Sequence, residues 1–312
     1  MYRFRLNTTS EDINGSVATL GCFDGLHRGH MQLFTKLNEV AIQQAYHRIA
    51  ITFEPTPFEF FSDCRGEIRV PRLSLLRDKF ILLKELNLVD ELVVLPFNAG
   101  LAKITAEQFT QSFLYAELNV RHMVVGHDFH FGNGGLGNVG NLDQVGIKVS
   151  VLPAYMEAGL RVSSSLIREL AKNNDLVGVQ TYLGRNLRYT SRVVHGNKLG
   201  RTLGVPTINL GLGRSIPAIW GIYVAKVYIE GETYNAVASV GKNPTVMPQN
   251  NGYKLEAHLL DVDLDLYGKV ATIEILSFLR PELKFDDLDT LMVQMQLDLE
   301  DARDYFRKSY CV

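Results

Sequence analysis

The sequence predicts two domains: an α/β domain built on a parallel sheet, followed by an antiparallel β-barrel with a closing C-terminal helix. Up to about residue 183, short apolar runs alternate with longer amphipathic segments, which is typical of strands joined by helices. From about Thr190 onward, apolar residues recur at every second position, as half-buried antiparallel strands require. The last segment, 286–306, has helical spacing instead. We therefore expect domains at 1–183 and 184–312.

In the first domain, the strands are expected where apolar runs are short and continuous. These runs are 17–20, 49–53, 92–95, 123–125 and 149–152. The helices are expected in the amphipathic segments 31–45, 75–87, 106–118 and 164–172. Because the carboxyl ends of parallel strands meet at one edge of a sheet, a ligand site is expected at that edge.

In the second domain, the strands are expected in "IYVAKVYI", "YNAVASV", "KLEAHLL" and "VATIEIL". The closing helix is expected to pack through a stripe of apolar residues at helical spacing: Leu288, Leu291, Met295, Leu299, Ala302 and Phe306. The acidic residues of this helix are expected on its solvated face: Asp298, Glu300, Asp301 and Asp304.

Composition limits the classes of partner. The 312 residues are 46% hydrophobic and 21% charged with a net charge of -2, which argues against a general nucleic-acid binder because such proteins neutralise phosphates with excess positive charge. The three cysteines have no metal-ligand spacing. No apolar stretch approaches the roughly 20 residues that span a bilayer. We expect a cytoplasmic protein with small-molecule partners, neither nucleic acid nor membrane.

The stretch "GCFDGLHRGH", Gly21 to His30, follows the first apolar run and leads into a predicted helix. A helix start at a strand end offers free N–H groups to an anion, and glycines allow a phosphate to approach closely. His27 and His30, three residues apart, can face the same anion. The spacing alone leaves other readings open: a zinc pair, buried core histidines, or a glycine-rich turn without a ligand.

The same residues resemble the His-x-Gly-His signature of nucleotidyltransferases. More specifically, the chain resembles the bacterial bifunctional riboflavin kinase/FMN adenylyltransferases over nearly its whole length. Matching segments in the first half are "FEPTPFEFF", "RLSLLRDKF", "VVGHDFHFG" and "RVSSSLIREL". In the second half they are "VVHGNKLGRTLGVPTINL", "SVGKNPTV" and "LEAHLLDVDLDLYGK". The resemblance implies a Rossmann-like nucleotidyltransferase domain and a barrel of the riboflavin kinase type.

In the first domain, the resemblance implies that FMN and ATP give FAD and pyrophosphate. His27 and His30 are the implied catalytic residues, holding the triphosphate, and further binding residues are implied at Gly21, Phe23, Asp24, Gly29, Phe53, Pro55, Asp128, Ser164, Ser165 and Arg168. Without the family, Phe53 would be assigned to the core, Pro55 to a strand end, and the serines with Arg168 to a helix cap beside an exposed arginine.

In the second domain, the resemblance implies that riboflavin and ATP give FMN and ADP. Thr207 and Asn209, two residues apart on an extended segment, offer a hydroxyl and an amide oxygen suited to Mg²⁺. Glu256 is the implied catalytic base, although alternation alone would place it on a solvent face. The implied ATP-binding residues are Gly196, Lys198, Gly200, Arg201, Gly204 and Pro206.

Several positions depart from the family pattern. Asp, Arg, Arg and Asp are usual where this chain has His127, His130, Gly135 and Asn138, and Thr is common at Ser165. The loss of two arginines lends weight to one alternative, a riboflavin kinase whose adenylyltransferase domain is weak or inactive and acts in regulation. A second alternative is a nucleotidyltransferase for another phosphate ester, such as a pantetheine phosphate, but the "PTIN" and glycine motifs of the second half argue against it.

Overall fold

The computed structural model describes residues 1–7, 14–195, 207–242, 252–262, 264 and 266–309. The chain forms two compact units, one of residues 1–70 and 79–163, the other of residues 71–78 and 164–312. These units divide the chain about twenty residues earlier than the predicted boundary at 183/184, and they assign the short segment 71–78 to the second unit.

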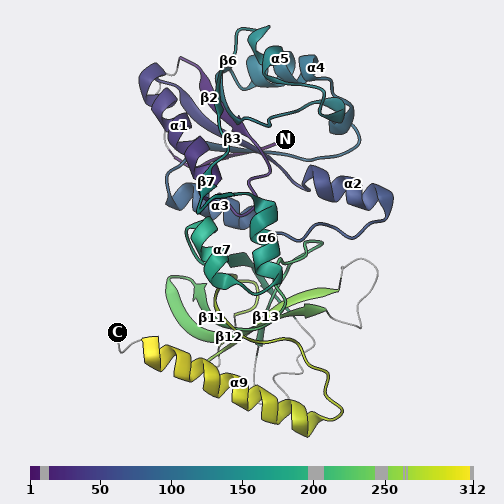
Figure 1. Cartoon of the computed structure of the whole chain (residues 1–312), viewed down its shortest axis with the longest axis vertical. Coiled ribbons are helices and arrows are strands. Elements are labelled where there is room, and N and C mark those ends of the chain that lie inside the picture. The colour runs from purple at the N-terminus through teal and green to yellow at the C-terminus, as the bar shows by residue number, and fades with distance from the viewer. Residues whose placement is uncertain (8–13, 196–206, 243–251, 263, 265, 310–312) are drawn as a thin grey trace. The chain divides into compact units, whose positions relative to one another are not determined.

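The first unit contains a six-stranded sheet in the order β1-β4-β3-β2-β5-β6, of which Figure 1 labels β2, β3 and β6. Strands β2 to β6 run parallel to one another, and the edge strand β1 pairs antiparallel with β4. The strands are β1 (Tyr2–Arg5), β2 (Ser16–Leu20), β3 (His47–Phe53), β4 (Glu91–Leu95), β5 (Val120–Gly126) and β6 (Lys148–Leu152). The expected parallel sheet is therefore confirmed, and β1 is an additional edge strand.

Helices and short turns surround this sheet. They are α1 (Arg28–Gln44), α2 (Pro57–Arg65), α3 (Leu76–Glu85), η1 (Leu101–Lys103), α4 (Ala106–Gln108), η2 (Phe109–Glu117), η3 (Asn133–Gly135) and α5 (Val139–Asp143). A small hairpin, β7 (Met156–Glu157) with β8 (Leu160–Arg161), follows β6. One core cluster joins the sheet to η2 through buried side chains that include Ile51, Val93, Leu114 and Met123.

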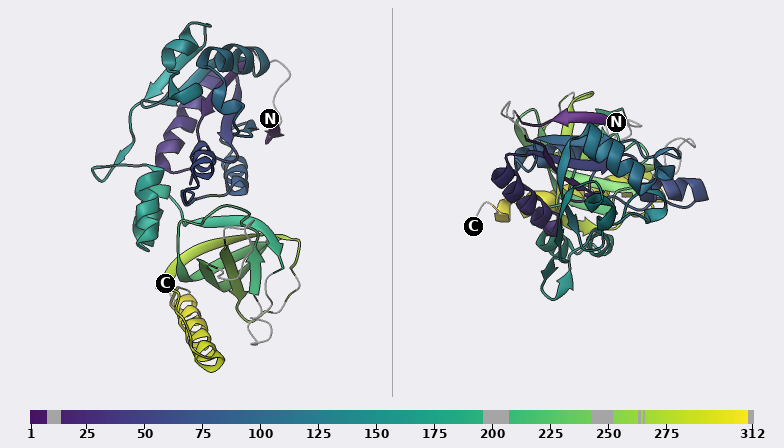
Figure 2. Two further views of the ribbon diagram at one scale, coloured as in Figure 1. Left: turned by 90° about the vertical axis from the view of Figure 1, so that its right-hand side faces the viewer. Right: turned by 90° about the horizontal axis from the view of Figure 1, so that it is seen from above.

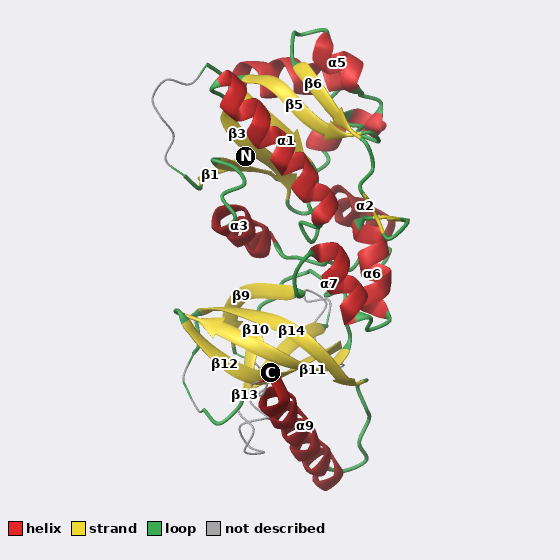
Figure 3. Cartoon of the chain, turned by 60° about the vertical axis from the view of Figure 1, so that its left-hand side comes forward, coloured by secondary structure: helices red, strands yellow, loops and turns green. Residues whose placement is uncertain are grey.

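The second unit is a closed antiparallel barrel in the order β10-β13-β12-β11-β14-β9 (Figure 3). Its strands are β9 (Arg188–Val194), β10 (Thr207–Leu210), β11 (Gly221–Ile229), β12 (Glu232–Lys242), β13 (Tyr253–Leu259) and β14 (Val270–Arg280). Along β13, Leu255, Ala257 and Leu259 are buried, whereas Glu256 and His258 between them are half-buried. The period-two pattern thus separates an inner from an outer face, as the sequence predicts.

The helices described in the later part of the second unit include α6 (Ser164–Lys172), α7 (Leu176–Leu183) and α9 (Leu288–Ser309). Helix α9 packs on the barrel through Leu299, Ala302 and Phe306, which contact a cluster with Val224 and Leu260. Its first turns extend past the barrel, as Figures 2 and 3 show. The expected stripe therefore contacts the barrel over the second half of the helix.

One expectation for α9 is wrong. The acidic run predicts Asp298 on the solvated face of the helix, but its side chain is 7% exposed and forms a two-pronged ion pair with Arg280, at 2.7 and 2.6 Å. A carboxylate at this position lies on the barrel side of the helix, and the guanidinium offsets the cost of burying it by binding both oxygens. Glu300, Asp301 and Asp304 are exposed, as expected.

The segment 71–78 is integrated into the second unit by backbone hydrogen bonds. Arg72 N–H donates to the Ile216 carbonyl at 2.7 Å, and Ala218 N–H donates to the Arg72 carbonyl at 3.1 Å. The buried Tyr189 hydroxyl donates to the same Arg72 carbonyl at 3.0 Å and accepts from Ala218 N–H at 2.9 Å. This part of the first half of the sequence therefore helps to build the barrel unit.

Candidate functional site

The loop between β2 and α1 carries the first candidate site. The backbone is in the left-handed region at Phe23 (φ 47), Gly25 (φ 81) and Leu26 (φ 44). Residues other than glycine rarely adopt this backbone conformation, and backbone strain of this kind clusters at ligand sites. Phe23 and Leu26 are buried, so packing of their side chains stabilises this backbone conformation.

The two histidines of the motif are brought together, as expected. His27 is the N-cap of α1, and its Nδ1 accepts a hydrogen bond from the His30 N–H at 3.3 Å. The two imidazole rings are stacked with centroids 3.6 Å apart, and the Phe23 ring meets His30 edge-on at 5.4 Å. The two imidazole rings therefore lie at the start of a helix, where the helix dipole favours binding of an anion.

Two glycines of the motif leave room for these rings. A Cβ at Gly29 would lie 3.2 Å from the His27 ring, and one at Gly21 would lie 3.2 Å from the Phe23 ring. Both contacts are tighter than ordinary van der Waals distances, so a larger residue would displace the ring. The glycines are therefore needed here for ring placement, and the expected approach of a phosphate to them stays a prediction. Asp24, in the same loop, is buried.

Phe53, at the end of β3, lies at the carboxyl edge of the sheet beside Gly21 and belongs to an aromatic cluster. Its ring meets Phe97 edge-on at 5.5 Å, and Phe60 and Phe61 of α2 contact Phe97 at 5.5 and 5.8 Å. Phe53 is half-buried, so the cluster presents aromatic surface near the strand ends. Phe97 was not among the expected site residues. Pro55 follows Glu54 through a cis peptide bond and leads into α2.

The loop after β5 contains the departures from the family pattern. Asp128 is paired with Arg161 of β8, which holds the pKa of the carboxyl below its usual range. His127 and His130 are exposed. Gly135 has φ 68, and a Cβ there would lie 3.8 Å from the Cβ of His130. The positions of the two missing arginines are thus close together.

Asn138 keeps a structural role that aspartate would also fill. Its side chain accepts a hydrogen bond from Gly140 N–H at 2.9 Å and caps α5, while Asn141 reaches back to the Asn138 N–H at 3.0 Å. Asn and Asp are about equally good N-caps. Replacement of the usual aspartate therefore leaves the loop's local structure in place.

The hairpin β7–β8 contributes contacts that were not expected from the sequence. Arg28, next to His27, pairs with Glu157 at 2.7 Å, and the Cβ of Tyr155 lies 3.5 Å from the position that a Cβ on Gly29 would take. Ala158 and Gly159 form the turn of this hairpin and both have positive φ, as a tight hairpin turn requires, but Ala-Gly is not one of the dipeptides that predict such a turn from sequence.

Ser164, Ser165 and Arg168 lie in the first turns of α6, which is part of the second compact unit. An Arg168 N–H donates to the Ser165 hydroxyl at 3.3 Å. Their expected grip on ATP phosphates stays a prediction.

The second candidate site lies on the outer face of the barrel. Asn209 of β10 is directly opposite Glu256 of β13, and Thr207 is opposite His258. Directly opposite residues of antiparallel strands share a face, with Cβ atoms about 5 Å apart. On the other side of β13, Ser239 of β12 is opposite Glu256. The register thus brings Thr207, Asn209 and Glu256 together, which spacing along the sequence alone does not show.

Lys254 adds a cation that the sequence reasoning missed. Its ammonium Nζ lies 3.8 Å from Glu256 Oε2, and the two side chains are 34% and 25% exposed. Lys254 and Glu256 are two residues apart on β13, so they share the outer face. That spacing is the signal that could have identified Lys254.

Gly196, Lys198, Gly200, Arg201, Gly204 and Pro206 lie outside the described residues. Within the described part of the chain, no group of three or more His, Cys, Asp or Glu residues could hold a metal ion. In that same part, no helix is both long and apolar enough to cross a bilayer.

Comparisons with known proteins agree for both halves. The family model for FAD synthetase matches residues 9–166, and the model for riboflavin kinase matches residues 183–306. The chain is 35% identical to the bifunctional riboflavin kinase/FMN adenylyltransferase of Haemophilus influenzae over 308 residues, covering 96% of this chain and 97% of the relative. The corresponding Escherichia coli protein is 34% identical over 305 residues, covering 96% of each chain.

A solved structure also matches along nearly the whole chain. It is a protein from Streptococcus pneumoniae named as a macrolide-efflux protein, with a TM-score of 0.73 and 30% identity, covering 96% of this chain and 97% of that one. The likeness extends over both compact units, whereas the name of that protein agrees with neither family model. With two family models in tandem and relatives that match end to end, the chain belongs to the bifunctional riboflavin kinase/FMN adenylyltransferase family.

Proposed function

We propose that the outer face of the barrel is the riboflavin kinase site and that the β2–α1 loop is the FMN adenylyltransferase site of this bifunctional enzyme. The observation that carries the kinase assignment is the register of β10 and β13, which sets Asn209 directly opposite Glu256 with Thr207 on the same face. Riboflavin and ATP give FMN and ADP there, and FMN and a second ATP give FAD and pyrophosphate at the other site.

At the kinase site, Glu256 acts as the general base. The terminal ribityl hydroxyl of riboflavin is a poor nucleophile until a base accepts its proton. As its oxygen bonds to the γ-phosphorus of ATP, the bond from that phosphorus to the β–γ bridging oxygen breaks, and ADP leaves. The proton passes to Glu256. Lys254, 3.8 Å from the carboxylate, holds Glu256 near its working position.

Thr207 and Asn209 fit a magnesium ion that accompanies ATP. A hydroxyl and an amide oxygen are hard ligands, and a site with few protein ligands suits an ion that keeps several waters and the nucleotide's phosphates. When bound, the ion supplies positive charge that offsets the negative charge of the phosphates. Both side chains are half-buried on the outer face, so they are accessible to a nucleotide.

At the adenylyltransferase site, no protein nucleophile is required. The FMN phosphate oxygen attacks the α-phosphorus of ATP, and the bond to the pyrophosphate oxygen breaks. His27 and His30 bind the phosphates at the start of α1, and their stacking fixes both rings. Catalysis then depends on position and on neutralisation of developing charge. The aromatic cluster around Phe53 and Phe97 offers apolar aromatic contacts for a flavin ring.

Incubation with riboflavin, ATP and Mg²⁺, followed by chromatography of FMN and FAD, tests both assignments. The wild-type enzyme is expected to form both products. Glu256→Gln should lower FMN formation by about 10² to 10⁴ because the amide cannot accept the proton, and FAD formation from supplied FMN should continue. A folded Glu256→Gln enzyme that phosphorylates at the wild-type rate would refute the kinase assignment. FMN without FAD from the wild-type enzyme would favour the regulatory alternative.

A further inference from the structure

The hairpin of β7 and β8 is not part of the six-stranded sheet. Within the described part of the chain, its two strands pair with each other and with no other strand. Its base is closed by a hydrogen bond that the Val162 N–H donates to the Tyr155 carbonyl at 2.9 Å. A two-stranded hairpin alone is at most marginally stable in water. Contacts with other segments must therefore hold this hairpin in its place.

One strand of the hairpin contacts the start of α1. Glu157 of β7 accepts a hydrogen bond from Nη1 of Arg28 at 2.7 Å, and the two side chains are 22% and 45% exposed. The second carboxylate oxygen of Glu157, Oε2, is buried, so the carboxylate is docked against the protein. Arg28 is the first residue of α1 and directly follows the N-cap, His27. The position of the hairpin is therefore coupled to that of the β2–α1 loop.

The other strand contacts the loop after β5. Arg161 of β8 forms an ion pair with Asp128 of that loop. Within the hairpin, Glu157 is opposite Leu160, and Arg161 is opposite Met156. Directly opposite residues share a face, and successive residues alternate between faces, so Glu157 and Arg161 extend from opposite faces of the hairpin. One face thus contacts the start of α1, and the other contacts the loop after β5.

Both contacted segments belong to the proposed adenylyltransferase site. The first carries His27 and His30, and the second carries Asp128, one of the binding residues implied for that site. Attack on the α-phosphorus requires both substrates in a fixed alignment, and a misplacement of about 1 Å costs up to about 10²-fold in rate. An exposed ion pair, by contrast, contributes little to the stability of a fold. We propose that Glu157 is a positioning residue for FAD formation, which acts through Arg28 to align the start of α1 with the loop after β5.

This inference rests on the adenylyltransferase site proposed at the β2–α1 loop, and steady-state kinetics of FAD formation from FMN and MgATP test it. Glu157→Gln keeps the size of the side chain and removes its charge. We expect kcat to fall about ten-fold because the reacting groups are less well aligned, while the KM values for FMN and MgATP stay within about two-fold. FMN formation from riboflavin should be unchanged.

Glu39→Gln is the matched control. Glu39 also pairs with a cation of α1, Lys36, at 2.9 Å, but this pair lies within the helix itself. The control should change neither kcat nor KM for FAD formation.

Two measurements separate a positioning role from a general effect on folding. In the wild type, kcat at saturating substrates should fall as NaCl is raised from about 0.05 to about 0.5 M, because salt screens exposed ion pairs; this dependence should be smaller in Glu157→Gln. Arg28→Gln should lower kcat as Glu157→Gln does, and the double variant should show no further fall, because both changes remove the same interaction. Thermal unfolding of Glu157→Gln should match that of the wild type.

Several results would overturn the inference: an unchanged kcat in Glu157→Gln, an additive double variant, or a salt dependence of kcat equal to that of the wild type. A raised KM for MgATP with an unchanged kcat would also overturn it, because the ion pair would then serve ATP binding and not alignment. Failure of the adenylyltransferase assignment would look different, because the wild-type enzyme would make no FAD from supplied FMN or His30→Ala would keep the full rate.

Discussion

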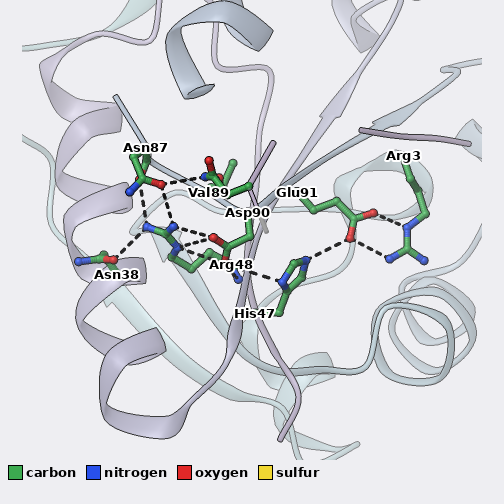
Figure 4. Close-up of polar contacts among 9 residues, drawn as sticks. Arg3, Asn38, His47, Arg48, Asn87, Val89, Asp90 and Glu91 are labelled. Atoms are coloured by element: carbon green, nitrogen blue, oxygen red, sulfur yellow. Dashed lines mark hydrogen bonds and ion pairs between the residues drawn. The ribbon is translucent and has the colours of Figure 1, made fainter. Parts of the chain in front are cut away.

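Glu91, the first residue of β4, lies in a polar network whose contribution to stability can be measured by acid titration (Figure 4). Its side chain is 3% exposed. Burial alone would raise the pKa of the carboxyl, but hydrogen bonds from Arg3 and His47 and the charges of the same residues outweigh burial and lower the pKa from 4.5 to about 2. Nη2 of Arg3 donates at 2.8 Å, and Nε2 of His47 lies 3.2 Å from the carboxylate.

The pKa value sets the size of the expected effect. Each tenfold change in ionisation constant corresponds to about 1.4 kcal/mol, so the difference between 4.5 and about 2 is worth about 3 kcal/mol. Because the folded-state pKa is depressed, this stability is present above pH 4.5 and is lost as the pH falls toward 2. Glu91→Gln should therefore lower the free energy of unfolding of the first unit by about 2 to 3 kcal/mol at pH 7.

Thermal unfolding followed by circular dichroism, between pH 3 and pH 7, provides the assay. At pH 7 the melting temperature of the first unit should fall by about 5 to 10 °C, and the difference from wild type should shrink as the pH drops below 4.5. Glu39→Gln is the matched control. Glu39 pairs with Lys36 at 2.9 Å, but its side chain is 51% exposed, so its loss should cost no more than about 0.5 kcal/mol.

Two results would refute this reasoning. In the first, Glu91→Gln has the same melting temperature as the wild type at pH 7, which would mean that the ion pairs stabilise the fold by no more than the cost of burying the carboxylate. Alternatively, the difference could stay constant down to pH 3, which would separate the loss of stability from ionisation of Glu91. The network lies at the amino ends of β3 and β4, whereas Gly21 and Phe53 lie at carboxyl ends. FAD formation at 25 °C should therefore be unchanged in the folded variant.

Three further predictions concern the two sites and the barrel. His30→Ala should lower FAD formation by about 10² to 10³, as loss of one charge-stabilising donor does, and leave FMN formation from riboflavin unchanged; equal loss of both products in a folded variant contradicts it. The carboxyl of Asp78 is fully buried, and burial raises its pKa to about 7. Hydrogen bonds that the carboxylate accepts from Thr190 and from the Leu75 N–H partly oppose this rise in pKa. Its ionisation costs stability as the pH rises through 7, so Asp78→Asn should stabilise the second unit at pH 8 relative to wild type and lose this advantage near pH 4; an unchanged difference between these pH values would count against it. Tyr189→Phe should cost about 1 to 2 kcal/mol by removing the hydroxyl that bonds Arg72 and Ala218, and a chemical denaturation midpoint equal to wild type would exclude that role.

Periodicity predicted most of the sheet and the barrel strands because each of those segments buries one face locally. Edge strand β1 was missed for the opposite reason. Its sequence, Tyr2–Arg5, is only four residues long with two arginines, and every residue in it is exposed. What makes it a strand is antiparallel pairing with β4, about 90 residues later in the chain, and no local pattern encodes a partner at that separation.

The Asp298 error has a more instructive cause. Counting along α9, Asp298 is three residues after Met295 and four before Ala302, so it lies on the same face as the predicted apolar stripe. Helical spacing alone therefore predicts that Asp298 faces the barrel, whereas its place in an acidic run predicts a solvated side chain. The spacing is the more reliable of the two patterns here. Its partner, Arg280, ends β14, and only the folded barrel brings the two together. The segment 71–78 is similar, since its hydrogen bonds with Ile216 and Ala218 connect residues more than 140 positions apart.

At Glu256 the sequence offered two readings that looked like alternatives, a solvent-facing side chain or a catalytic base. In the barrel, a solvent-facing position and a role as catalytic base are compatible. Its interior is filled by side chains such as Leu255 and Ala257, so a substrate can only approach from outside, and only outward residues can reach it. Alternation therefore identifies which residues are accessible, and the register of β10 with β13 selects, among these, the ones that lie together.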